Sequence, residues 1–157
     1  MLDPRDIAIL DLLQQDADTP LAAISAHVHL SPSACSRRIA HLREAGYIRR
    51  NVVQVDRRRI GLPTTLFVSI RAKQHCEEWT TRFRAAIEAI PEIVEAHRMT
   101  GTVDYLLKVV LPSVERYDAV YKQLIAAIEM SEVSAHISME TLKDASALPL
   151  GQLAPRG

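Results

Sequence analysis

Apolar residues in the first third of the chain recur at steps of three and four, the spacing that places side chains on one face of an α-helix. Three such stretches follow one another, and their starts lie at Asp3-Pro4, Thr19-Pro20 and Ser31-Pro32. These dipeptides are typical helix starts, because a side-chain oxygen caps free N–H groups and proline needs no hydrogen bond there. The sequence therefore predicts three short helices, with apolar positions Ile7, Leu10, Leu13; Leu21, Ile24, Val28; and Cys35, Ile39, Leu42.

The second and third helices are separated only by the tight connection His29-Leu30, and Gly46 is placed to end the third in a left-handed conformation. Two short helices across a tight turn are typical of a helix-turn-helix unit, although an ordinary three-helix packing corner shows the same pattern. Residues 47–55 then read as an extended strand closed by the arginines at 57–59. We expect this strand to be a wing or an arm to the next domain.

In the second half of the chain, the pattern of apolar and β-branched residues changes and predicts six further elements. In order they are strand, helix, strand, strand, helix and strand, over residues 64–70, 79–90, 93–99, 105–111, 114–128 and 133–141. This order predicts a ferredoxin-like βαββαβ domain, in which both helices cover one face of an antiparallel sheet. The fold class is α+β, with an N-terminal winged helix-turn-helix domain in residues 1–60, the ferredoxin-like domain in 61–145 and a flexible tail in 146–157.

The other face of that sheet has no helices left to cover it. Alternate residues of the third strand, Leu106, Lys108 and Val110 against Leu107 and Val109, predict that both faces are mostly apolar. A second copy of the chain is the natural cover, so we expect a homodimer.

Charge is segregated along a chain whose formal net charge is zero over 157 residues. Residues 1–30 hold one base and five acids, whereas residues 31–60 hold eight arginines and only two acids. Arginine forks onto phosphates and guanine edges, so the segregation indicates a surface that faces a polyanion, with a solvated charged surface as the alternative. The 48% hydrophobic content excludes disorder as the main state, and the sequence shows no spanning or secretion segment, so we expect a cytoplasmic protein.

The third predicted helix has an outward surface suited to the major groove. With Cys35, Ile39 and Leu42 buried, its N-terminal half turns Ser33, Arg37 and Ala40 outward. Small side chains there would not obstruct a close approach to base edges, and the positive helix start would meet phosphate.

Nothing in the sequence argues for an enzyme, a metal or a cofactor. The six histidines are scattered without ligand spacing, and the five glycines never cluster into a phosphate loop. Cys35 lies in a predicted buried stripe, where a thiol is usually inert. Cys76, beside His75 in a predicted loop, leaves a redox or metal role open.

Taken together, these motifs resemble bacterial Lrp/AsnC (feast/famine) transcriptional regulators. The similarity runs from about Leu2 to Leu150, and the matching residues are Leu2-Asp3, Ile7-x-Ile9-Leu10, Leu30-Ser31-Pro32, Cys35-x-x-Arg38-Ile39-x-x-Leu42-x-x-x-Gly46-Tyr47-Ile48, Pro91, Thr100-Gly101, Asp104-Tyr105-Leu106-Leu107 and Met139-Glu140. The resemblance implies a domain that binds double-stranded DNA, joined to a domain for effector binding and oligomerisation. It also implies dimers that associate into octamers, and effectors that are commonly amino acids held between paired domains.

The resemblance further implies two sets of site residues. The DNA-binding set comprises Ser33, Ser36 and Arg37 at base edges, Arg38 and Arg43 at phosphates, and also Ser31 and His41. The effector-binding set comprises Met99, Thr100, Gly101, Thr102, Asp104, Tyr105, His136 and Ser138. In the effector loop, turn amides would bind a carboxylate and Asp104 an α-ammonium, although a tight turn capped by Asp104 is an alternative. Thr102 stands where the family often has an acid, and His136 has an alternative role as an interface histidine.

The leading hypothesis is a sequence-specific DNA-binding regulator of transcription whose activity responds to an amino acid or a related small molecule. An architectural protein that wraps DNA without an effector would use the same arginines. An amino-acid-binding metabolic enzyme is disfavoured, because no catalytic constellation is present.

Overall fold

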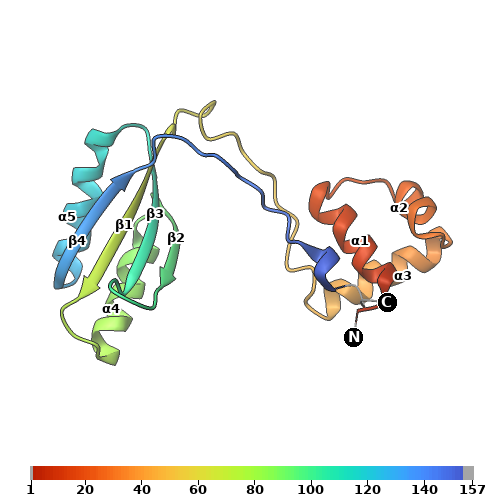
Figure 1. The fold of residues 1–157 in the computed structure, drawn as a ribbon, viewed down its shortest axis with the longest axis horizontal. Coiled ribbons are helices and arrows are strands. Elements are labelled where there is room, and N and C mark those ends of the chain that lie inside the picture. The colour runs from red at the N-terminus through yellow and green to blue at the C-terminus, as the bar shows by residue number, and fades with distance from the viewer. Residues whose placement is uncertain (1, 154–157) are drawn as a thin grey trace. The chain divides into compact units, whose positions relative to one another are not determined.

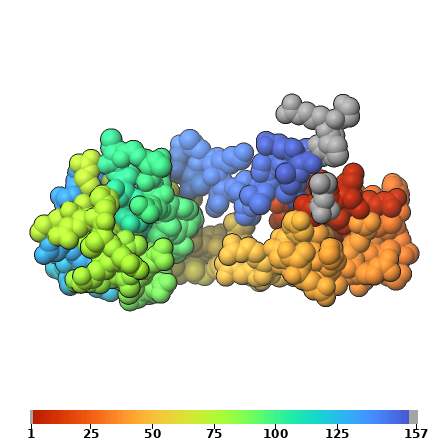
Figure 2. All heavy atoms as spheres, turned by 90° about the horizontal axis from the view of Figure 1, so that it is seen from below, coloured from red at the N-terminus to blue at the C-terminus, as the bar shows by residue number. Residues whose placement is uncertain are grey.

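The computed structural model describes residues 2–153 of the chain, which form two compact units. The helical unit contains residues 2–54 and also the segment 142–153, and the second unit is Val55–Thr141. Figure 2 shows the blue atoms at the end of the returning segment against the red atoms of the first helix. The sequence-based division at residues 60 and 145 stays a prediction, and residues 154–157 of the predicted tail lie outside the described part.

The helical unit contains the three predicted helices, α1 (Pro4–Gln15), α2 (Leu21–Val28) and α3 (Pro32–Glu44) (Figure 1). Asp3 and Ser31 cap α1 and α3 as expected. The expected cap at Thr19 is wrong, because its hydroxyl donates to the carbonyl of Asp16 and α2 begins without a side-chain cap. The stripe predicted for α3 is confirmed as buried, and Ile24 and Val28 of α2 join it in the core together with Ile9 of α1. Leu21 is exposed, so the prediction is wrong at that position, and Leu10 and Leu13 are only partly buried.

The turn between α2 and α3 depends on one residue in an unfavourable conformation. His29 has φ 53° and ψ 49°, the left-handed region that a residue with a Cβ rarely adopts. This conformation lets the N–H of Leu30 reach the carbonyl of Ser25 at 3.1 Å and ends α2 abruptly. Gly46 ends α3 in the same region, with φ 78°, as predicted.

The strand predicted at 47–55 does not form. No strand is present between α3 and residue 64, and Val52, Val53 and Val55 are exposed. The β-branched residues have strand propensity, but propensity alone makes no ladder when no neighbouring strand supplies hydrogen bonds. Within the described residues this segment is therefore the arm to the second unit, one of the two roles expected from the sequence.

The second unit has the ferredoxin-like order, with strands β1 (Thr64–Ala72), β2 (Ile93–Arg98), β3 (Tyr105–Leu111) and β4 (Met130–Ile137). The two helices are α4 (Glu77–Ala89) and α5 (Tyr117–Ala127), the latter preceded by a 3₁₀ turn at Val114–Arg116. The strands pair antiparallel in the order β2-β3-β1-β4, and both helices lie on one face (Figure 1). The last strand begins and ends earlier than predicted, because its pairing with β1 starts where Met130 meets Ala72.

The core of this unit lies between the sheet and its helices. Leu107 and Val109 of β3 are fully buried there, beside Leu124 of α5. Trp79 and Phe83 of α4 stack with centroids 5.0 Å apart and contact Tyr105, so aromatic packing fixes α4 on the strand that follows the predicted effector turn.

The open face of the sheet is more polar than expected. Lys108 bonds Glu95 at 2.7 Å, and Arg71 pairs with Glu132 at 3.3 Å, so charged pairs cross between neighbouring strands. The prediction that both faces are mostly apolar is therefore wrong for this face, whose apolar side chains are Phe67, Leu106 and Val110.

We expect His29→Gly to stabilise the helical unit by about 0.5–1 kcal/mol, because glycine adopts the left-handed conformation without the steric cost of a Cβ. A rise in the thermal midpoint, followed by circular dichroism of the full chain, would show this. His27→Gly, inside the same helix, is the matched control and should lower the midpoint. A lower midpoint for both variants would contradict the account of the turn.

Candidate DNA-binding and effector sites

Most of the predicted DNA-binding residues lie together on the outward surface of α3. Ser31 is the N-cap, and its hydroxyl accepts from the N–H of Ala34 at 3.3 Å and lies 3.1 Å from the Ser33 hydroxyl. The exposed members of the set are Ser31, Ser33, Ser36, Arg37, His41 and Arg43. A helix start that presents N–H groups, hydroxyls and guanidinium groups on one surface can bind phosphate and hydrogen-bond to base edges.

Arg38 differs from the other members, because it faces into the helical unit. Its Nη1 atom lies 2.6 Å from Asp3 Oδ2 and 2.7 Å from Asp6 Oδ1. The two aspartates form a capping box at the start of α1, in which each side chain accepts from the other residue's N–H. Arg38 therefore joins α3 to the first turn of α1 through charge-assisted hydrogen bonds.

These contacts change the ionisation of the groups that make them. The N–H of Asp6 and the guanidinium of Arg38 both hold the pKa of Asp3 below its ordinary value. Hydrogen bonds first to Asp6 and then to Asp3 raise the pKa of Arg38 further. Both shifts stabilise the charged forms of Asp3 and Arg38.

Other arginines of the basic segment also have partners within their own unit. Arg57 donates to the carbonyl oxygens of Leu62 and Pro63, at 3.3 and 2.6 Å, and so closes the turn before β1. Arg59 pairs loosely with Asp56 at 3.4 Å. These contacts keep the positive charge of Arg57 but leave it fewer free donors for a ligand.

The turn between β2 and β3 carries the predicted effector loop. Gly101 has φ 105°, and the N–H of Met99 donates to the carbonyl of Asp104 at 2.8 Å. Arg71 donates from Nε and Nη2 to the carbonyl of Thr102, at 3.0 and 2.6 Å, which holds the turn to the end of β1. Met99, Thr100 and the two residues after it are exposed, so the turn is open to a ligand.

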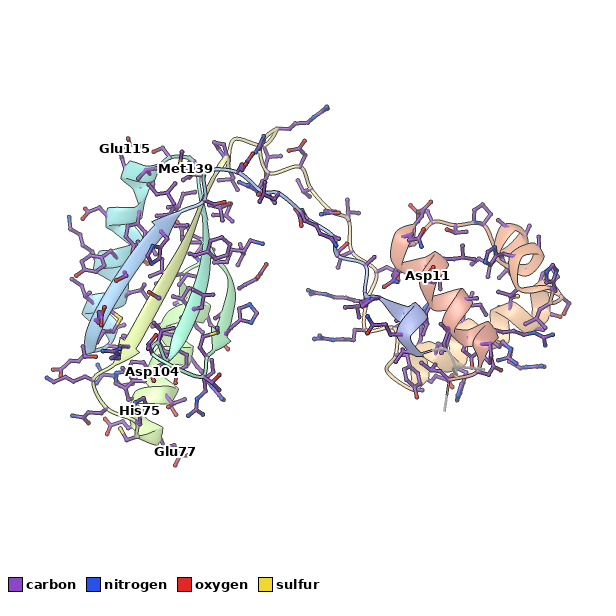
Figure 3. All side chains as sticks on the ribbon, in the orientation of Figure 1. Asp11, His75, Glu77, Asp104, Glu115 and Met139 are labelled. Carbon is purple, nitrogen blue, oxygen red and sulfur yellow. The ribbon has the colours of Figure 1, made fainter. Side chains whose placement is uncertain are left out.

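Asp104 has a structural role in this turn. Its Oδ2 accepts from the N–H of Ala72 at 2.8 Å, and Oδ1 lies 3.6 Å from His75 Nε2 (Figure 3). The bond to Ala72 ties the turn to the end of β1, so it differs from the local cap considered from sequence. Oδ1 makes no hydrogen bond within residues 2–153 and still faces partly to solvent, so the carboxylate can also accept from an ammonium group.

His136 and Ser138 are not brought to the turn within one chain. His136 pairs with Phe67, and the N–H of Ser138 donates to the carbonyl of Thr65, whereas the turn is bonded to Ile70 and Ala72. At about 3.3 Å per residue, His136 lies roughly 10 to 16 Å along the sheet from the turn. In Figure 3 Asp104 and Met139 mark opposite ends of the sheet.

A cavity of about 150 Å³ lies elsewhere in the second unit, beside the start of α4. Lys73, Cys76 and Trp79 line it together with Glu129, and none of the predicted effector residues does.

Cys35 is buried and Cys76 exposed. Within residues 2–153, no group of histidine, cysteine and acidic side chains could hold a metal ion. The same residues include no helix long and apolar enough to cross a membrane.

Comparison with known proteins gives matches to both units. Residues 2–49 match the family described as winged helix-turn-helix DNA-binding, and residues 65–148 match the Lrp/AsnC ligand binding domain. The HTH-type transcriptional regulator Zrp of Zymomonas mobilis is 52% identical over 149 residues, which cover 95% of this chain and 97% of that protein.

Solved structures are similar over nearly the whole chain. An AsnC family transcriptional regulator from Agrobacterium tumefaciens has 43% identity and a TM-score of 0.92, covering 97% of this chain and 99% of that one. A transcriptional regulator from Neisseria meningitidis in complex with L-Met has 26% identity and a TM-score of 0.92, covering 98% and 99%. The fold class inferred from sequence is confirmed.

Replacing Arg38 by Met should destabilise the helical unit by about 1–2 kcal/mol, because it leaves the largely buried Asp6 carboxylate without its cationic partner. Arg37→Met, on the exposed side of the same helix, is the matched control and should change stability little. Urea denaturation of the two variants measures the difference. Equal midpoints would show that the Arg38 contacts do not stabilise the unit.

The same network predicts a dependence on pH. Because the pKa of Asp3 is lowered on folding, its contribution is fully present above its ordinary pKa of 3.8 and is lost as the pH falls through the lowered value. Stability measured between pH 5 and about pH 2 should therefore fall less steeply in Arg38→Met than in the wild type. Parallel curves would exclude a role for Arg38 in this titration.

Proposed function

Because the chain belongs to the Lrp/AsnC family of DNA-binding transcriptional regulators, we propose that it reads specific operator sequences through α3 and adjusts its DNA affinity to an amino acid or a related small molecule. The observation that carries the proposal is the outward surface of α3, where small hydroxyl side chains surround Arg37. The side chain that braces this helix, Arg38, points the other way.

The side chains of α3 divide into three roles in this proposal. Ser33, Ser36 and Arg37 contact base edges, with Arg37 placed to donate two hydrogen bonds to guanine. Ser31, His41 and Arg43 contact the sugar-phosphate backbone and set the register of the helix. Arg38 is a positioning residue, and any phosphate contact it makes uses the guanidinium nitrogens other than Nη1.

The effector is proposed to bind at the turn between β2 and β3. No hydrogen bond within residues 2–153 involves the N–H groups of Thr100, Gly101 and Thr102, and Gly101 permits a close approach, so this backbone can bind a carboxylate. Asp104 would pair with the α-ammonium, while Met99 and Tyr105 flank the turn. The L-Met complex of the Neisseria meningitidis regulator supports an amino acid as the chemical class.

The chain is proposed to act as a homodimer that associates further, up to an octamer, in the cytoplasm. Helix-turn-helix proteins read paired half-sites, which requires two recognition helices. The effector set also points to a second copy, because His136 and Ser138 lie far from the turn of their own chain. If they contact the effector, they do so at the turn of a partner.

Arg37→Met should reduce affinity for an operator selected from random DNA by roughly 1–3 kcal/mol, and reduce affinity for random DNA much less. Arg43→Met, the proposed phosphate contact, should weaken binding to both DNAs equally and lower the salt dependence of binding. Fluorescence anisotropy with the two DNAs separates these patterns. An equal loss for both DNAs in Arg37→Met would contradict its base-reading role.

Screening the twenty amino acids by thermal shift should identify one that raises the midpoint of the full chain, because a ligand at about 100 times its Kd stabilises the folded state by about 2.7 kcal/mol. Asp104→Asn should abolish the shift, since the amide keeps an oxygen for the N–H of Ala72 but loses the charge that pairs with an ammonium. Glu88→Gln, an exposed acid of α4 that makes no hydrogen bond or ion pair with the turn within residues 2–153, is the control. A wild type that responds to no amino acid would contradict the effector class, and an undiminished shift in Asp104→Asn would contradict the site.

A further inference from the structure

The segment that follows β4 connects the two units a second time. The chain passes from the helical unit into the second unit at Gln54, and it leaves that unit at Thr141. From Leu142 onward, the described residues belong again to the helical unit. The two units are thus joined by the arm before β1 and by the segment 142–153, which we call the strap.

The strap is held to α1 by the side-chain amide of Gln14. The N–H of Leu148 donates to Gln14 Oε1 at 2.8 Å, and Gln14 Nε2 donates to the carbonyl of Leu148 at 2.9 Å. Nε2 also donates to Asp11 Oδ1 at 2.9 Å, which orients the amide (Figure 3 labels Asp11). Gln14 therefore bonds both polar groups of one backbone residue, as a neighbouring strand would.

The sequence around Leu148 favours the backbone conformation that this contact requires. Pro149 disfavours helical backbone at Leu148, which keeps that residue extended. A 3₁₀ turn, Leu150–Leu153, follows and lies against α1. Leu148 and Leu153 remain 67% and 57% exposed, so hydrogen bonds rather than apolar burial hold these two residues. Leu150 is partly buried, and its release exposes some apolar surface.

We propose that the strap, latched by Gln14, transmits the state of the effector turn to the DNA-binding helices, an inference that rests on the proposed effector response. The path is continuous along one strand. β4 starts where Met130 pairs with Ala72, whose N–H is held by Asp104 of the turn, and it ends at Ile137, from which residues 138–141 lead to the strap. A ligand at the turn that alters the bond between Asp104 and the N–H of Ala72 also alters the pairing of Ala72 with Met130. In this proposal β4 carries that change to the strap, and the latch passes it to α1.

The energetic consequence is reciprocal. If the effector changes DNA affinity through the strap, DNA must change effector affinity by the same factor. Releasing the latch removes this coupling without removing either binding site, because Gln14 belongs to neither proposed site. The arm before β1 stays in place, so any coupling that it carries persists.

Hydrogen exchange measures the latch directly. The variant is Gln14→Leu, which keeps the size and helix propensity but loses both bonds to Leu148, and the control is Gln15→Leu, whose amide bonds only Asp11. We expect exchange in residues 142–153 to be about tenfold faster in Gln14→Leu and unchanged in Gln15→Leu. Wild-type exchange as fast as that of Gln14→Leu would overturn the latch.

Transmission from the effector turn to the DNA-binding helices is measured by a coupling factor. This factor is the Kd for DNA without ligand divided by the Kd for DNA with the amino acid that stabilises the wild type. In Gln14→Leu and in a chain ending at Thr141 the factor should fall toward one, while DNA Kd without ligand and ligand Kd without DNA each stay within about twofold. Gln15→Leu should keep the wild-type factor. A wild-type factor in both test variants would overturn the strap's role and assign the coupling to the arm.

If the proposed effector response is wrong, the measurements give a result that differs from failure of the strap. If no amino acid changes the DNA affinity of the wild type, the effector response is wrong and the strap has nothing to transmit. The exchange measurement needs no ligand or DNA, so it then decides the latch alone.

Discussion

The contact of one guanidinium with two carboxylates sets the geometry of α3, the helix that we propose reads DNA. Arg38 holds the first turn of α1 through Asp3 and Asp6 at 2.6 and 2.7 Å, and it stands one residue after Arg37, which faces outward. Because neighbouring residues on a helix point about 100° apart, fixing one fixes the direction of the other. The acidic character of residues 1–30 is thus partly structural, since two of its five acids neutralise a base of the recognition helix.

In the second unit, contacts with neighbouring elements fix the position of the turn between β2 and β3. Pairing of β3 with β1 sets Asp104 beside Ala72, and the stacking of Tyr105 on Trp79 fixes the strand that follows. The exposed turn amides are therefore presented by a rigid frame, as a binding site needs. The open face of the sheet also carries charged pairs between neighbouring strands. If a second copy covers this face, such charges favour one defined alignment of the two copies.

Local rules predicted much of this architecture, and the errors lie where a residue depends on partners far away in the sequence. Caps at Asp3 and Ser31, the buried face of α3 and the bounds of β3 follow from periodicity and side-chain chemistry. The strand at 47–55 failed because no neighbour supplies its hydrogen bonds, and the start of β4 depends on pairing with β1. The partners of Arg38 lie more than 30 residues away and those of Gln14 more than 130, so only the packed helices reveal them. The one sequence signal for the contacts of Arg38 was the combination of an acidic start in the first helix and several arginines in the third.

We propose that α3 reads base sequence while Arg38 holds this helix in place. Repeated selection of DNA from a random library by the full chain, followed by sequencing of the enriched pool, tests this. We expect the pool to converge on a motif with two related half-sites, each covering the few base pairs that one recognition helix contacts. A pool that stays random, although the protein binds it with strong salt dependence, would contradict the claim and indicate binding through phosphates alone.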